Sequence, residues 1–256
     1  MKVISLGWGV QSFTLAAMSA LGELPPVDAA IHADTTHERA ATYEFAQRWT
    51  PWLEKHGVRV VTVRARAERT DPCYSVAVAS IFLPLFTMRV DGVASGLLRR
   101  QCTNEWKVSP IHRWLQANRN GAHVEQSIGI SLDEALRMKA ADVSYVTNMW
   151  PLVDRRMTRW DCMRWLREHE LEVPSRSSCV FCPFHDRASW RAMKRDNGPD
   201  WQAALELDEK IRHKRPGYIC YLTAQLKPLA DCDFSNAEDH GQLALWDEEC
   251  TGYCFL

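Results

Sequence analysis

The first twelve residues, MKVISLGWGVQS from Met1 to Ser12, decide the fold of this chain. Residues 2–6 predict a short buried strand, a glycine-rich turn follows directly, and an apolar helix begins near Phe13. A strand, a tight turn and a helix N-terminus form an anion site, because backbone N–H groups and the positive end of the helix dipole converge there. Gly7 and Gly9 let a phosphate approach the backbone, and Ser12 offers it a hydroxyl group. The stretch predicts a phosphate-binding loop, with an ordinary strand-to-helix turn as the simpler alternative.

Strands and helices then alternate along the chain. Residues 27–33, 58–63 and 125–131 predict strands, and residues 40–56 predict a long helix. This alternation predicts an α/β fold built on a doubly wound, mostly parallel sheet, in which ligands bind at the carboxyl ends of strands.

Two groups of polar residues fall at that predicted edge of the sheet. Ser5 ends the first strand, and Asp34, Thr35 and Glu38 follow the second. An acidic residue there is well placed for a ribose hydroxyl or a metal ion. The simpler alternative is a polar loop in which Asp34 caps the next helix.

Four local predictions follow from the remaining pattern. Residues 75–90 read as a packed helix with a break at Pro84, and residues 150–153 as a short strand. Thr103 is expected to cap a helix over 111–117, and Thr158 to cap a helix over 159–169.

A cationic stretch surrounds a single cysteine. Arg99, Arg100 and Lys107 flank Cys102 within nine residues, and such cations can hold phosphate or sulfate. Five arginines between Arg155 and Arg167 form a second positive region, which could follow a nucleic-acid backbone or be a solvated helix face.

Nine cysteines need an explanation, and the strongest signal among them is Cys179-Val-Phe-Cys182-Pro. A C-x-x-C turn places two thiolates on one metal or cluster, or forms a redox pair. An iron–sulfur cluster, a zinc ion and no metal are the three interpretations, in that order of preference. Cys250 and Cys254 lie in a cysteine-rich tail, whereas Cys73 and Cys162 read as structural thiols.

The net charge and the hydropathy pattern of the chain exclude some classes of protein. Its net charge of −1 provides no global attraction to nucleic acid, so any such binding must use a local patch. The N-terminus does not resemble a signal peptide and no apolar run is long enough to span a membrane, so we expect a cytoplasmic protein without a membrane partner.

Four segments together resemble the PP-loop adenine-nucleotide α-hydrolase superfamily, which includes ATP pyrophosphatases, tRNA thiolation enzymes and phosphoadenosine-phosphosulfate (PAPS) reductases. SLGWGVQS resembles the PP-loop Ser-Gly-Gly-x-Asp-Ser, with Gln11 in place of the aspartate, and HADTTHERA resembles Asp-Thr-Gly-x-Glu. RRQCTNEWKVSPI resembles an Arg-Cys-x-x-x-x-Lys-x-x-Pro segment, and GISLDEALRM resembles a segment whose final arginine, here Arg137, faces phosphate. The segments occur in the family order over residues 1 to about 190.

The resemblance implies a site and its cofactors. Nucleotide-binding residues would be Ser5, Gly7, Gly9, Gln11, Ser12, Asp34, Thr35, Glu38, Arg99 and Arg100. The residues that would take part in catalysis are Lys107, Arg137 and the tail thiols Cys250 and Cys254. An iron–sulfur cluster of the 4Fe-4S type would be bound by Cys102, Cys179, Cys182 and Cys250. The nucleotide would be ATP with Mg²⁺, or PAPS or its adenosine phosphosulfate (APS) analogue.

Three functions remain open at this point. The preferred one is adenylation of an acceptor, a tRNA base or a DNA backbone phosphate, followed by sulfur transfer from a cysteine desulfurase or another sulfur or electron donor. The alternatives are a PAPS or APS reductase, and a catalytically silent nucleotide-binding subunit, to which the Gln11 replacement would be suited. The expected domains are a PP-loop domain over 1–155 and a helical, cysteine-bearing region over 156–256, with a homo-oligomer as one expected state.

Overall fold

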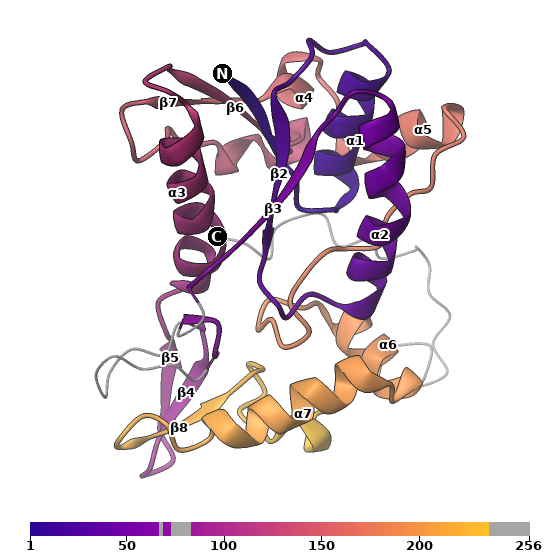
Figure 1. The fold of residues 1–256 in the computed structure, drawn as a ribbon. Coiled ribbons are helices and arrows are strands. Elements are labelled where there is room, and N and C mark those ends of the chain that lie inside the picture. Colours follow the sequence, from indigo (N-terminus) through magenta and orange to yellow (C-terminus); the bar gives the residue numbers. More distant parts are fainter. Residues whose placement is uncertain (67–68, 73–82, 236–256) are drawn as a thin grey trace. The chain divides into compact units, whose positions relative to one another are not determined.

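The computed structural model describes residues 1–66, 69–72 and 83–235 of the 256-residue chain (Figure 1). The chain divides into two compact units, and each is built from two separate segments. Unit 1 comprises Met1–Ala65 and Trp106–Ser177, and unit 2 comprises Arg66–Glu105 and Ser178–Leu256. A division at one boundary near residue 155 does not describe these units. Within the described residues, no helix has both the length and the apolarity to cross a membrane.

Unit 1 is built on a five-stranded sheet in which every neighbouring pair of strands is parallel. The strand order is β3 (Val60–Arg64), β2 (Ala29–Asp34), β1 (Lys2–Ser5), β6 (Val124–Ile128) and β7 (Val146–Met149). The predicted α/β fold with a parallel sheet is confirmed.

Helices cover both faces of this sheet, so it is doubly wound (Figure 1). Helices α1 (Val10–Ala20) and α2 (Ala40–Lys55) lie on one face with Ile4, and α5 (Arg159–Glu168) packs against α1. Helix α3 (Ser109–Asn118) lies on the other face with Val3. Adjacent residues of β1 therefore enter opposite cores, as the two-residue period of a strand requires.

Unit 2 contains an antiparallel sheet that the sequence pattern did not predict. Its strand order is β5 (Ala94–Leu97), β4 (Phe86–Arg89) and β8 (Tyr218–Tyr221). The expected helix over 75–90 is therefore wrong at Phe86–Arg89, because pairing with a strand about 130 residues away outweighs the local pattern. Helices α6 (Arg187–Asp196) and α7 (Pro199–Ile211), with the short 3-10 helix η4 (Leu229–Asp231), complete the described elements of this unit.

Two further predictions are corrected and one is confirmed. Residues 150–153 are not a strand, because Pro151 begins the short helix α4 (Pro151–Asp154), where its fixed φ angle suits a first helical position. Thr103 is not a cap: helical structure begins at Cys102 and continues through the π-helix η2 (Asn104–Val108) into α3. Thr158 does cap α5, in a reciprocal capping box with Asp161.

Candidate nucleotide site and cysteine turn

The loop after β1 lies where the strand order of the unit 1 sheet reverses. The chain passes from β1 outward to β2 and β3, and later returns to place β6 on the other side of β1. The loops that follow β1 and β6 therefore lie next to each other at one edge of the sheet, and ligands of doubly wound folds bind at such a reversal. Ser5, the last residue of β1, pairs with Ile31 and Ile128.

Gly129, directly after β6, fixes how closely these two loops approach. A Cβ atom at this position would lie 2.7 Å from the backbone nitrogen of Ser12 and 2.9 Å from its Cα. Only glycine leaves room for this backbone contact. Gly129 was not among the predicted site residues, although a glycine directly after a strand was a visible signal.

The loop itself is closed by the side chain of Ser12. The Gly7 N–H donates to Ser12 Oγ over 3.1 Å, and Ser12 Oγ donates to the Gly9 carbonyl over 3.2 Å. Gly9 is the N-cap of α1 and supplies no side-chain cap, and none of the residues in the first turn is acidic. The first N–H groups of α1 are therefore left for an anionic ligand.

Trp8 holds the loop to the core beneath it. It adopts a left-handed conformation with φ = +57°, which is unfavourable for a residue with a Cβ atom. Its side chain is 2% exposed and packs against Phe13, His32 and Phe45. This aromatic packing offsets the backbone strain and sets the orientation of the peptide groups on either side.

Gln11 links the loop to the segment after β6. Its Nε2 donates to Ser131 Oγ over 3.4 Å and to Glu134 Oε2 over 3.3 Å. Glu134 also pairs with Arg137, and both lie on the 3-10 helix η3 (Leu132–Arg137). The predicted phosphate ligand Arg137 is thus linked to the loop through Glu134, and position 11 carries an amide instead of a carboxylate.

Asp34, at the end of β2, is saturated with protein donors. It accepts hydrogen bonds from the Thr36 N–H (2.8 Å), the Tyr43 hydroxyl (2.9 Å) and the Arg64 guanidinium (2.7 Å). Burial alone would raise the pKa of Asp34, but these hydrogen bonds hold it below its usual value. A ribose or metal contact at Asp34 would require it to give up one of these partners.

Glu38 and Lys107 form the second polar group at this edge. The side chain of Glu38 is 2% exposed, and its Oε1 accepts from Lys107 Nζ over 3.0 Å and from Thr35 Oγ1 over 3.4 Å. Glu38 Oε2 is buried and has no hydrogen-bond partner in the described part of the chain. A buried carboxylate oxygen without a partner is costly, so a donor or cation supplied by a ligand would stabilise it.

The cysteine turn in unit 2 is held by its own backbone. The Cys182 N–H donates to the Cys179 carbonyl over 3.1 Å, and the His185 N–H donates to the Cys182 carbonyl over 3.0 Å. The His185 ring donates its Nε2–H to the same Cys179 carbonyl over 2.9 Å. These bonds place the two half-buried thiols on one turn and keep Nε2 of His185 away from a ligand role.

The predicted metal ligands are only partly brought together. Cys102 lies in unit 2 with Cys179 and Cys182, and Arg100 lies over the Phe184 ring at 5.4 Å, which brings this segment to the turn. Over the ranges that the structure describes, however, no group of three or more Cys, His, Asp or Glu side chains is placed to hold a metal ion. The pair fits two positions of a cluster and does not form a complete ligand set. We therefore derive no step through a cluster.

Other predicted residues belong to unit 2 or lie outside the residues that the structure describes. Arg99 and Arg100 are exposed residues of unit 2. Cys73, Cys250 and Cys254 lie outside the described residues, so their predicted roles stay predictions. Burial raises the pKa of Cys162 to about 12, which agrees with its reading as a structural thiol.

The arginines of the second positive region are partly paired. Arg155 binds the carbonyl and the carboxylate of Glu23, and Arg164 pairs with Asp161 and Glu168. Glu23 comes from outside this stretch of sequence and adds a negative charge beside it, and the predicted nucleic-acid contact stays a prediction.

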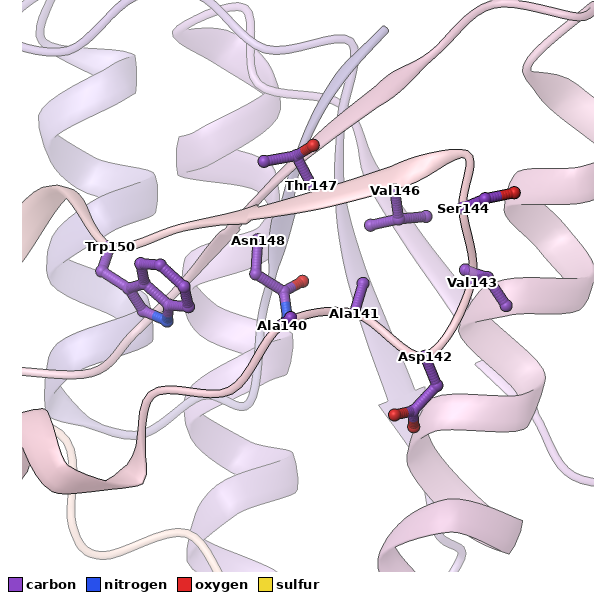
Figure 2. A pocket seen from close by; sticks show the side chains of 9 residues that line it. All are labelled: Ala140, Ala141, Asp142, Val143, Ser144, Val146, Thr147, Asn148 and Trp150. Carbon is purple, nitrogen blue, oxygen red and sulfur yellow. The ribbon is translucent and has the colours of Figure 1, made fainter.

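One hollow of unit 1 is lined by a different set of residues. Figure 2 shows it beside the edge strand β7, where it has a volume of about 370 Å³ and is lined by residues between Ala140 and Trp150. None of the predicted site residues lines it. Within unit 1, the predicted residues of the loop after β1 lie at the reversal point of the sheet instead.

Comparison with known proteins finds similarity among solved structures only. No protein-family model matches the chain, and no curated protein matches it. A phosphate complex of phosphoadenylyl-sulfate (PAPS) reductase from Candida auris is similar in structure, with 11% sequence identity and a TM-score of 0.47. The match covers 68% of this chain and 74% of that chain. A similarity of this size does not assign a function.

Proposed function

We propose that unit 1 binds the phosphate groups of an adenine nucleotide at the loop after β1. The observation that carries this proposal is the position of the loop at the strand-order reversal, in backbone contact with Gly129 and linked to η3 through Gln11. The open N-terminus of α1 and the side chain of Arg137 supply positive charge for the phosphates. Lys107, held by Glu38, supplies a further cation at the same edge of the sheet.

We propose further that the nucleotide activates an acceptor for sulfur transfer. The acceptor oxygen attacks the α-phosphorus of ATP, the bond from that phosphorus to the bridging oxygen breaks, and pyrophosphate leaves with the electron pair. A sulfur nucleophile then displaces AMP from the adenylated position. Arg137 and Lys107 would stabilise the charge that builds up on the phosphate oxygens during the first step. Cys179 and Cys182, as two thiols on one rigid turn, are the candidate groups for handling sulfur.

The reaction products test this proposal directly. With ATP and an acceptor RNA or DNA, the protein should release pyrophosphate and AMP in equal amounts, and neither should form without the acceptor. The variant Arg137→Gln should lower the rate of release, whereas Arg119→Gln changes a half-buried arginine at the end of α3, over the Tyr145 ring, and should not. Release of orthophosphate and ADP instead would contradict adenylation.

The Gln11 amide favours a second candidate, a sulfonucleotide reductase. Phosphates of ATP are usually carried by Mg²⁺, which prefers carboxylate ligands, and the loop has an amide at this position. A sulfonucleotide lacks the β and γ phosphates and has less need of a metal ion. This candidate requires that PAPS or APS with reduced thioredoxin yield sulfite, oxidised thioredoxin and the adenosine phosphate. Sulfite formation without pyrophosphate release from ATP would decide in its favour.

A further inference from the structure

We infer that unit 2 carries a separate site for a base of a single-stranded nucleic acid, in a cavity beside the cysteine turn. The cavity has a volume of about 500 Å³, within the roughly 300–1,000 Å³ typical of small-molecule sites. Its lining is dominated by ring side chains: Phe86, Phe184, His185, Trp190 and Phe234. No motif of the sequence indicated this cavity.

The rings are fixed before any ligand binds. Trp190 is 2% exposed and stacks on Phe234, with ring centres 6.0 Å apart and an angle of 19° between the planes. The His185 ring meets Trp190 edge-on at 4.7 Å, and that histidine is itself tied to the Cys179 carbonyl. These buried rings form a preorganised wall, and the half-buried Phe184 beside them is a ring on which a base can stack. Stacking on a preorganised ring costs little entropy, and every nucleobase has a π-face that can use it.

Cations around the rings indicate a ligand that carries phosphate. The Arg100 guanidinium lies 5.4 Å from the centre of the Phe184 ring, and Lys194 Nζ lies 5.9 Å from the centre of the Phe234 ring. Arg187 lines the cavity itself, and Asp233 is the one carboxylate among the lining residues. Arg100, Arg187 and Lys194 are all exposed, so they can meet a phosphodiester while a base occupies the cavity. Arg187 and Lys194 also donate to backbone carbonyls, which are neutral, so a phosphate would add the complementary charge that an aromatic side chain of a protein partner lacks.

The position of the cavity connects it with the sulfur chemistry. Pro183 lines the cavity and directly follows Cys182 in the chain. A base in the cavity would thus lie next to the cysteine turn, within the same unit. This inference rests on the proposed function and specifies it: the acceptor is a base rather than a backbone phosphate.

The test compares two dye-labelled strands of equal length, a single-stranded oligonucleotide of mixed sequence and a strand whose sugars carry no bases. The intact chain should bind the base-bearing strand more tightly in fluorescence anisotropy. Phe184→Leu keeps an apolar side chain at a half-buried position but removes the ring face, and should weaken that binding by about 5- to 100-fold. Binding of the base-free strand should not change. Tyr218→Leu removes a ring of unit 2 that does not line the cavity, and should leave both affinities unchanged.

A second variant keeps the inference testable if Phe184→Leu fails to fold. Arg187→Gln changes an exposed side chain and should weaken both strands equally, with a shallower salt dependence. Equal affinity of the intact chain for the two strands, or no effect of Phe184→Leu in a protein that melts like the parent, would overturn the inference. Displacement of the strand by ATP would also overturn it, because the cavity would then be a nucleotide site. Base-dependent binding without pyrophosphate release would contradict the proposed function and leave the cavity standing.

Discussion

The loop after β1 and the cysteine turn are both short motifs, but they acquire their shapes in different ways. In the turn, the three hydrogen bonds that fix Cys179 and Cys182 join residues at most six positions apart. In the loop, the hydrogen bond from Gln11 to Ser131 joins residues 120 positions apart, and the contact with Gly129 spans a similar distance. The turn is thus specified locally, whereas the loop is completed only when β6 pairs beside β1.

This difference predicts how each region responds to substitution. Changes within the turn should affect the thiols and leave the sheet intact. Substitutions after β6, which is more than 100 residues from the loop in sequence, should also damage the nucleotide site. Four experiments test this contrast.

The largest expected effect concerns metal at the turn. Cys179→Ala and Cys182→Ala should each abolish the iron content of protein purified without oxygen, because losing one thiolate exposes a cluster to solvent and oxidation. Nucleotide affinity should stay unchanged. Iron and acid-labile sulfide analysis provides the measurement. Zinc found in place of iron would mean that the turn binds zinc and not a cluster.

Cys162 provides the matched control for this pair. It is fully buried in the core of unit 1 and its thiol has a raised pKa, so Cys162→Ala should keep all of the iron. Unchanged iron in Cys179→Ala would show that the turn does not bind metal.

The next largest effect tests the long-range part of the loop. Gly129→Ala places a Cβ atom 2.7 Å from the Ser12 nitrogen, a backbone atom that cannot rotate away. We expect a loss of stability of about 1–3 kcal/mol, as for overpacking, and no nucleotide binding detectable by calorimetry. Gly198→Ala is the control, because its Cβ would meet nothing within 4 Å. Normal nucleotide affinity in Gly129→Ala would place the site elsewhere.

A smaller effect is expected at Ser12 within the loop. Ser12→Ala removes the hydroxyl that closes the loop and that could donate to a phosphate, so nucleotide affinity should fall by about 1.5–3 kcal/mol. Ser19→Ala makes the same change at the other end of α1, where the hydroxyl bonds to the Pro25 carbonyl. It should lower stability slightly and leave affinity intact. Equal affinities in the two variants would contradict the role of Ser12.

The smallest effect is a pH dependence that belongs to unit 1. His32 lies beneath the loop, where burial lowers its pKa even though its Nδ1 bonds to the Leu6 carbonyl. The folded state therefore resists protonation, and stability should fall as the pH drops below the unfolded value of about 6.5. His32→Asn keeps a donor for Leu6 but cannot take up a proton, so its stability should change less between pH 7 and pH 5. Chemical denaturation at each pH measures this, and equal slopes for both proteins would contradict the role of His32.

The first strand, the turn after it and the alternation of strands and helices were readable from the sequence. They depend on residue periodicity and on glycines within a few positions of each other, which is information that a local window contains. The same holds for the Thr158 cap and for the C-x-x-C turn, whose partners lie within six residues. Strand β4 was missed because its partner β8 lies in a distant part of the chain, and the local apolar run resembled a helix.

The sequence by itself determined the parallel α/β sheet, the loop after β1 and the pair of thiols, because each is encoded by neighbouring residues. Only the tertiary structure decided what surrounds them. Pairing of β6 with β1 brings Gly129 against Ser12 and joins Gln11 to Glu134, and the return of the chain to unit 2 sets aromatic rings beside the cysteine turn. Such contacts depend on which distant strands and helices meet, and their energy is gained only after those elements have formed and packed.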